Sequence, residues 1–213
     1  MTPFDVLTFA VLTFVGVRLA QAAHISILSR SRMWLLVRGV RLRHVLLAIP
    51  VLAAVIAVAL ALFTLPVLSW GWWTALGGEG NPVFGTSKST QGSPFEIIIP
   101  LAFLVLLVPG LPLFVENEEQ VFRRGAERRT SVQNVGRSVM FGLAHAIVGI
   151  PIGAALALSI GGAYLTIMYL RGWRATGTQA GALAESTRAH LAYNLVIVTL
   201  VAVALLVDLA LSA

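Results

Sequence analysis

The chain has no cysteine, only one lysine among its 15 basic residues, and few charged residues of any kind. The absence of cysteine excludes disulfide bonds, thiolate metal sites and cysteine nucleophiles. Charged residues make up 11% of the sequence and hydrophobic residues 58%, whereas a soluble domain has about 25% charged residues. This composition excludes a soluble globular domain, a disordered chain and a collagen-like fibre, and it predicts a protein of the lipid bilayer.

Apolar runs of about 20 residues predict an all-α, polytopic transmembrane bundle of about six spans without a soluble domain. The run 138–170 would make a helix of roughly 50 Å, which is too long for one crossing. The segment Gly149-Ile150-Pro151-Ile152-Gly153 is its natural break, so we expect two helices there. The other runs are 4–28, 44–69, one that starts near 95, and 189–211. Residues 1–90 would hold the N-terminal spans and an outer loop, and residues 91–213 the core that carries the polar clusters.

Arginine is concentrated in every second connection, namely 30–43, 123–137 and 171–188. The loop 71–93 has only Lys88 and Glu79. Cytoplasmic loops of membrane proteins are rich in Arg and Lys, so both termini are expected outside, with a polar cavity open to the cytoplasm. The same rule explains the net charge of +6 without a nucleic-acid partner. Trp70, Trp72 and Trp73 are predicted to form an aromatic belt at the outer surface.

The first polar cluster within an apolar stretch is Glu118-Glu119-Gln120-Val121-Phe122-Arg123. Glu119 and Arg123 are four residues apart, so on a helix they would share a face and form an ion pair. Glu118 lies about 100° around the helix and lacks that cation, which leaves it available as a general base. The alternative is that both acids only cap an Arg-rich helix end.

Two further clusters follow, Phe141 with His145 and His190 with Asn194, each pair four residues apart. His190 and Asn194 can both donate hydrogen bonds to one point, as an oxyanion site requires. The alternative is a polar clamp between membrane helices, and His145 alone could be an ordinary core residue. If the cytoplasmic helix ends are near 129, 131 and 178, Glu118, His145 and His190 lie roughly 16 to 21 Å along their helices, which would bring them to one level.

In this order the clusters resemble the CPBP family of intramembrane proteases, which includes type II CAAX prenyl endopeptidases and bacteriocin-processing and immunity proteins. The family motifs E-E-x-x-x-R, F-x-x-x-H and H-x-x-x-N are all present, and the resemblance covers about residues 95–206. It implies that Glu118 is the catalytic base and His145 its partner in activating a water. It implies that His190 and Asn194 stabilise the oxyanion, and that Glu119, Arg123 and Phe141 support the site.

The resemblance leaves the use of a metal open. Glu118, His145 and His190 could ligate zinc with a fourth position free, or Glu118 could deprotonate water directly. The sequence shows no acidic partner that would orient either histidine in a zinc site, so metal-independent hydrolysis is the preferred interpretation.

The expected function is an intramembrane endopeptidase of a bacterial plasma membrane, which cleaves lipidated or leader-type peptides in a cavity that faces the cytoplasm. A non-catalytic scaffold or self-immunity protein of the same fold is the main alternative. A proton-coupled transporter is the third, but it predicts paired helix interruptions in both halves of the chain, and only one half shows them.

Overall fold

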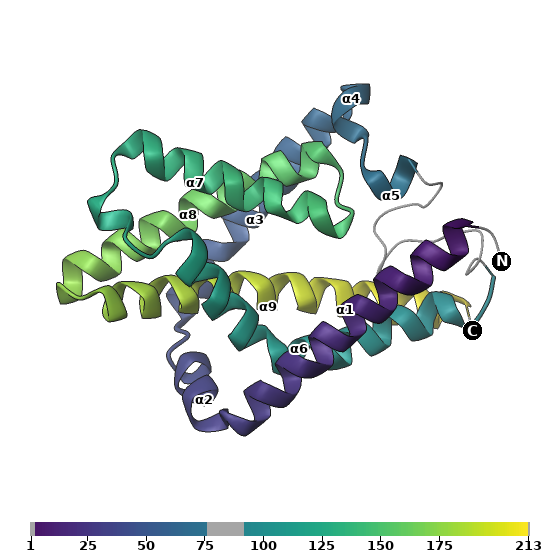
Figure 1. The fold of residues 1–213 in the computed structure, drawn as a ribbon, viewed down its shortest axis with the longest axis horizontal. Coiled ribbons are helices and arrows are strands. Elements are labelled where there is room, and N and C mark those ends of the chain that lie inside the picture. Colours follow the sequence, from purple (N-terminus) through teal and green to yellow (C-terminus); the bar gives the residue numbers. More distant parts are fainter. Residues whose placement is uncertain (1–2, 76–91, 213) are drawn as a thin grey trace.

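The computed structural model describes residues 3–75 and 92–212, and all regular secondary structure there is helical (Figure 1). The part of the predicted outer loop that contains Lys88 and Glu79 lies outside these residues. The elements in chain order are α1 (Pro3–Leu28), α2 (Arg30–Arg38), α3 (Leu42–Phe63), α4 (Pro66–Ser69), α5 (Trp72–Ala75), α6 (Phe95–Phe122), η1 (Ala126–Arg128), α7 (Ser131–Ala144), η2 (His145–Val148), α8 (Ile152–Thr176) and α9 (Gln179–Ser212).

Five of these helices, α1, α3, α6, α8 and α9, are long and apolar enough to cross a membrane. The predicted membrane character and all-α class are therefore confirmed, but the predicted count of six spans is not. The difference is α7, whose 14 residues give about 21 Å, less than the roughly 30 Å of a bilayer core. The prolines at 100, 109 and 112 do not divide α6. Helix α9 begins ten residues before the predicted start. Its first turns are less apolar than the rest, so the apolar run in the sequence does not include them.

The hairpin of α7 and α8 forms where the sequence predicts a break. Thr130 starts α7 with a capping box, in which its hydroxyl accepts from the Gln133 N–H at 3.3 Å and its own N–H donates to Gln133 Oε1 at 3.0 Å. This exchange satisfies donors that a helix start leaves unpaired. Gly149 ends η2 in the left-handed conformation, φ 86°, which favours glycine. Pro151 is the N-cap residue of α8, and proline is well tolerated at a helix start.

Helix α9 joins two groups of helices, one of α3, α7 and α8 and the other of α1 and α6 (Figure 1). α8 is the most buried span, with 56% of its apolar window inside the protein against at most 28% for the others. The outer spans instead expose large apolar side chains, among them Phe14, Leu60 and Val105, as expected of surfaces that contact lipid. The two groups meet where the end of α6 crosses α9 (Figure 1).

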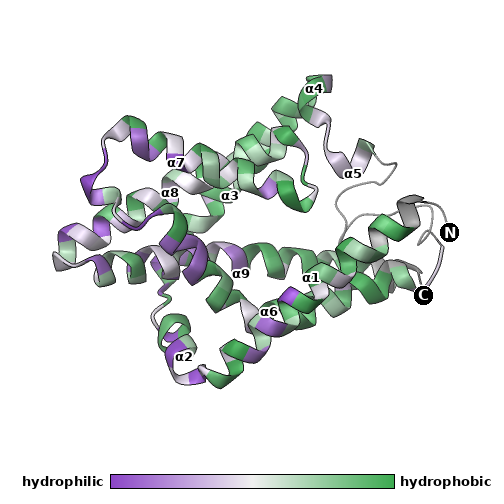
Figure 2. Cartoon of the chain, viewed as in Figure 1, coloured by the Kyte–Doolittle hydropathy of each residue, from purple (hydrophilic) through white to green (hydrophobic). Residues whose placement is uncertain are grey.

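The polar segments gather at one end of the bundle. α2, the α6–α7 connection and the α8–α9 turn lie on the side of the molecule away from the start of α1 and the end of α9, and hydrophilic residues are frequent in α2, at the end of α6 and in the α6–α7 connection (Figure 2). Of the three residues of the predicted aromatic belt, Trp73 packs inward, because it is only 1% exposed. Trp72 is partly buried and donates its Nε1–H to the carbonyls of Ala146 and Ile147 at 3.1 and 3.2 Å; its place in a belt stays a prediction.

The contact between α7 and α8 predicts opposite effects of two alanine substitutions on one helix. At Gly142 a Cβ would overlap the Ala155 carbonyl and lie 2.7 Å from the Ser159 nitrogen, whereas at Gly136 it would meet nothing within 4 Å. Gly142→Ala should therefore lower the free energy of unfolding by about 1–3 kcal/mol. Gly136→Ala should raise it by about 0.5–1 kcal/mol, since glycine is unfavourable inside a helix. Thermal unfolding in one detergent measures both; a lower midpoint for Gly136→Ala than for Gly142→Ala would contradict this packing.

Candidate active site

The structure brings the first and third polar clusters into direct contact. His190 on α9 lies between the two acids of α6: its Nδ1 is 2.9 Å from Glu119 Oε1 and its Nε2 is 3.6 Å from Glu118 Oε2. A carboxylate only accepts hydrogen bonds, so the Nδ1–H of His190 donates to Glu119. Two of the helix ends used to predict one common depth, 131 and 178, are close to the observed starts of α7 and α9, whereas α6 ends at Phe122 and not near 129. Glu118 and His190 lie side by side, and the common depth of these two residues with His145 stays a prediction.

Glu119 and Arg123 form the predicted ion pair, deep inside the protein. Their side chains are 0% and 1% exposed and the Nε–Oε2 distance is 3.8 Å. Arg123 also donates through Nη2 to the Gly162 carbonyl at 3.3 Å. An acid that only capped a helix end would be solvated, so this alternative is wrong for Glu119. Glu118 differs from its neighbour, because 38% of its side chain is exposed.

The ring of Phe141 is at the centre of the cluster. The His145 ring lies edge-on to it at 4.9 Å, and the His190 ring at 5.6 Å. The Arg123 guanidinium carbon lies 4.2 Å from its centroid, a cation–π contact. Because Phe141 is 4% exposed and packed on all these partners, it fixes the positions of both imidazoles relative to the buried ion pair.

His145 opens η2, immediately after α7. Its Nδ1 lies 2.9 Å from the Phe141 carbonyl, and since a carbonyl only accepts, this nitrogen carries the hydrogen and Nε2 remains available. Asn194 is half-buried one turn after His190 on α9. Within 3–75 and 92–212 no hydrogen bond engages its side chain, so its part in an oxyanion site stays a prediction.

The contact between Glu119 and His190 corrects one inference from the sequence. The sequence shows no acidic partner for either histidine, yet Glu119 is such a partner for His190 at 2.9 Å. The two residues are 71 positions apart and meet only because α6 crosses α9. The sequence offered one signal for this contact. Glu119 follows Glu118 directly, and a helix directs two consecutive side chains to different sides, so Glu119 could reach a partner that Glu118 does not.

The three proposed zinc ligands do not form a ligand set. In the described part of the chain no three His, Asp or Glu side chains lie close enough together to hold a metal ion. The orientation of each imidazole by a hydrogen bond at Nδ1 is common to metal sites and to metal-free sites. The residues present therefore do not fit a zinc ion as they are placed, and we derive no step through one.

A polar cavity of about 520 Å³ lies beside this site, at the Arg-rich end of the bundle. Glu185 of α9 is in its wall, but none of the candidate catalytic residues lines it. The expected cavity at Glu118 and His190 thus remains a prediction, and access to the site is shown only by the exposed part of Glu118.

Comparison of the chain with family models, with curated proteins and with solved structures gives no match. The three motifs and their meeting in space are therefore the basis for any functional conclusion. The meeting is informative because residues of α6, α7 and α9 converge on one ring, that of Phe141.

The buried pair predicts unequal costs for removing two arginines that each face a glutamate. Arg123→Gln would leave the Glu119 charge buried without its cation, which costs about 3–5 kcal/mol of folding free energy. Arg32→Gln removes the 2.6 Å pair with Glu116, where Arg32 is 63% exposed, and exposed pairs contribute at most about 1 kcal/mol. Thermal unfolding of both variants measures the difference; equal shifts in the midpoint would contradict a structural role for Arg123.

Proposed function

We propose that the protein is an intramembrane endopeptidase of the CPBP type, in which Glu118 activates a water molecule for attack on a peptide bond. The observation that carries this proposal is the position of the partly exposed Glu118 carboxylate, 3.6 Å from Nε2 of His190. The other nitrogen of that ring is held by a fully buried carboxylate. One acid is thus open to a reactant while the other only orients the imidazole.

In the proposed reaction Glu118 takes a proton from water as the hydroxide forms a bond to the carbonyl carbon of the peptide. The carbonyl oxygen becomes an oxyanion. When the C–N bond of this tetrahedral intermediate breaks, the proton held by Glu118 passes to the leaving nitrogen. The products are a carboxylic acid and an amine. The second proton of the water then passes from the acid to the amine, which leaves a carboxylate and an ammonium group, and Glu118 is regenerated. A positioned general base of this kind contributes about 10²–10⁴-fold to the rate.

The oxyanion requires donors, and the site offers nitrogen atoms of His190 and Asn194. His190 donates through Nδ1 to Glu119, and its Nε2, which lies 3.6 Å from Glu118, is the nitrogen assigned to the oxyanion in this proposal. The amide of Asn194 is one helical turn further along α9 and supplies the second donor. Losing one donor of this type costs about 10²–10³-fold in rate. His145, whose ring contacts Phe141 at 4.9 Å, is assigned the role of assisting in holding the water.

This mechanism uses no metal, and its support is geometric. Glu118, His145 and His190 are not gathered into a three-ligand set in the described residues, whereas Glu118 and His190 lie 3.6 Å apart, so one water beside them can hydrogen-bond to both. Glu119 and Arg123 are positioning residues here, because both are buried and Glu119 acts only through the His190 ring.

The substrate class follows from the site's surroundings. The five helices that are long and apolar enough to cross a membrane support a membrane-associated peptide, lipidated or of the leader type, as the proposed substrate. The Arg-rich end of the bundle faces the cytoplasm of a bacterial plasma membrane in this proposal, by the positive-inside rule. The bilayer is the other partner, and no nucleic acid is involved.

Glu118→Gln tests the activity, because it keeps the shape of the side chain and removes the base. Membranes of a deletion strain that is complemented with wild type, Glu118→Gln or Glu116→Gln would be compared by mass spectrometry of peptide ends. We expect new ends with wild type and a loss of about 10²–10⁴-fold in their yield with Glu118→Gln. Glu116→Gln is the matched control: it lies half a turn earlier on α6 and pairs with Arg32 instead, so its ends should match wild type.

Identical peptide ends from wild type and Glu118→Gln, with both proteins inserted at equal levels, would contradict the peptidase. That result would favour the scaffold or self-immunity function, in which the site residues serve binding or folding alone.

The orientation is testable because the chain lacks cysteine, so a single introduced thiol is the only reactive one. Thr178→Cys lies between α8 and α9 at the Arg-rich end, and Thr64→Cys follows α3 at the other end. In intact cells a membrane-impermeant thiol reagent should label Thr64→Cys, and it should label Thr178→Cys only after permeabilisation. The reverse pattern would contradict a site that is open to the cytoplasm.

A further inference from the structure

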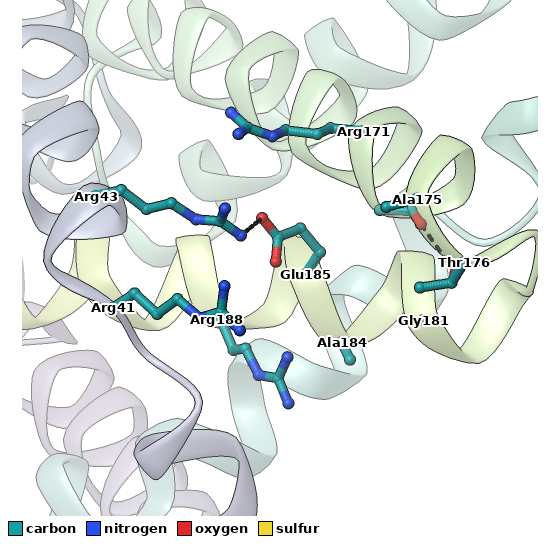
Figure 3. A pocket seen from close by; sticks show the side chains of 10 residues that line it. Arg41, Arg43, Arg171, Ala175, Thr176, Gly181, Ala184, Glu185 and Arg188 are labelled. Atoms are coloured by element: carbon teal, nitrogen blue, oxygen red, sulfur yellow. Dashed lines mark hydrogen bonds and ion pairs between the residues drawn. The ribbon is translucent and has the colours of Figure 1, made fainter.

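The cavity at the Arg-rich end is lined by four arginines and a single acid. Arg41 and Arg43 come from the start of α3, Arg171 from α8, and Arg188 and Glu185 from α9 (Figure 3). Positive side chains from three elements therefore surround a space of about 520 Å³. This is within the range of about 300–1,000 Å³ that small-molecule sites occupy.

Glu185 neutralises only part of this charge. Its Oε1 lies 2.6 Å from Nη2 of Arg43 and 3.3 Å from Nε2 of His44. The other ring nitrogen of His44 accepts the Arg41 backbone N–H at 3.0 Å, so the hydrogen of the ring is on Nε2 and is donated to Glu185. Both contacts of the Glu185 carboxylate are thus with residues of α3, and one of them holds Arg43 at the cavity wall.

The remaining arginines have no acidic partner. No ion pair in the described ranges engages Arg41, Arg171 or Arg188 (Figure 3). The Nε atoms of Arg43 and Arg188 are buried there without a hydrogen-bond partner. Buried donors without a partner are costly, and like charges that share one cavity repel each other. An anion inside the cavity would reduce the repulsion among these positive charges.

Close backbone packing keeps this arrangement in place. At Gly39, next to α2, a Cβ would overlap the Arg188 guanidinium, and at Gly172 a Cβ would lie 2.7 Å from Cβ of Glu185. The lack of side chains at these two positions lets α2 approach Arg188 and lets α8 approach α9. Helix packing therefore holds Arg188 and Glu185 in the cavity wall, whereas Arg41 and Arg171 are exposed side chains.

We infer that this cavity binds a phosphate group, the headgroup phosphate of an anionic phospholipid. Guanidinium groups match the oxygens of phosphate with paired, charge-assisted hydrogen bonds. The cavity is built at the starts of α3 and α9 and the end of α8, which are membrane-spanning helices, and basic pockets at such helix ends face lipid headgroups. The inference is independent of the proposed peptidase.

The test compares the purified full chain in nanodiscs of phosphatidylcholine with and without phosphatidylglycerol. Wild type should retain phosphatidylglycerol in native mass spectrometry, and inorganic phosphate should displace it. The double variant Arg171→Gln/Arg188→Gln should bind this lipid at least about tenfold more weakly. Arg174→Gln is the control: it is exposed on α8 outside the cavity and should retain the lipid as wild type does.

Arg171→Gln alone covers the case in which the double variant does not fold, because Arg171 is exposed and has no buried partner. A phosphate-dependent rise in the unfolding midpoint without retention of phosphatidylglycerol would assign the site to soluble phosphate, and would overturn the headgroup as its source. Equal retention by wild type and both cavity variants would overturn the site, as would an equal loss with Arg174→Gln.

Discussion

The buried carboxylate of Glu119 is the interaction on which the rest of the site depends. It contacts His190 on one side at 2.9 Å and Arg123 on the other at 3.8 Å, and all three side chains are at most 3% exposed. A charge at this depth is stable only with such partners. The contact between Glu119 and His190 therefore links α6 to α9. It also orients the His190 ring toward Glu118. Burying the charges of Glu119 and Arg123 costs folding free energy, and the same buried carboxylate holds the imidazole of His190 in place.

Helix α9 carries both polar centres of the protein, on different faces. His190 contacts α6 and Phe141 of α7, while Glu185 contacts Arg43 and His44 of α3. These two positions are separated by five residues, which is roughly 140° around a helix. One helix can thus contribute one side chain to the candidate active site and another to the cationic cavity, although the two sites share no residue. This arrangement explains why none of the candidate catalytic residues lines the cationic cavity, although both are built on α9.

Local patterns predicted most of the fold. The break at Gly149 and Pro151 and the ion pair of Glu119 with Arg123 both follow from spacing and residue type, and both are present. The count of six spans is not confirmed, because α7 has only 14 residues, about 21 Å of helix, and an apolar run does not by itself show how much of it one helix occupies. The contacts of Trp72 and Trp73 were missed for a related reason, since an aromatic residue near an interface can equally pack inward.

The contacts between distant segments could not be predicted in this way. Glu119 and His190 meet through the crossing of two helices, and the cationic cavity needs three elements to come together. Spacing along one helix carries no information on either. Phe141 is intermediate: its motif position implied support of the site, but only the structure shows that its ring contacts Arg123 and both histidines.

The most direct test of the account is hydrolysis by the purified protein in heavy-oxygen water. Peptides extracted from bacterial membranes would be incubated with wild type or Glu118→Gln in nanodiscs, and new carboxyl ends would be scored for the heavy isotope. The account predicts labelled ends with wild type, because water supplies the attacking oxygen, and none above background with Glu118→Gln. Labelled ends in equal amount with both proteins, or with neither, would contradict the assignment of Glu118 as the base of a peptidase.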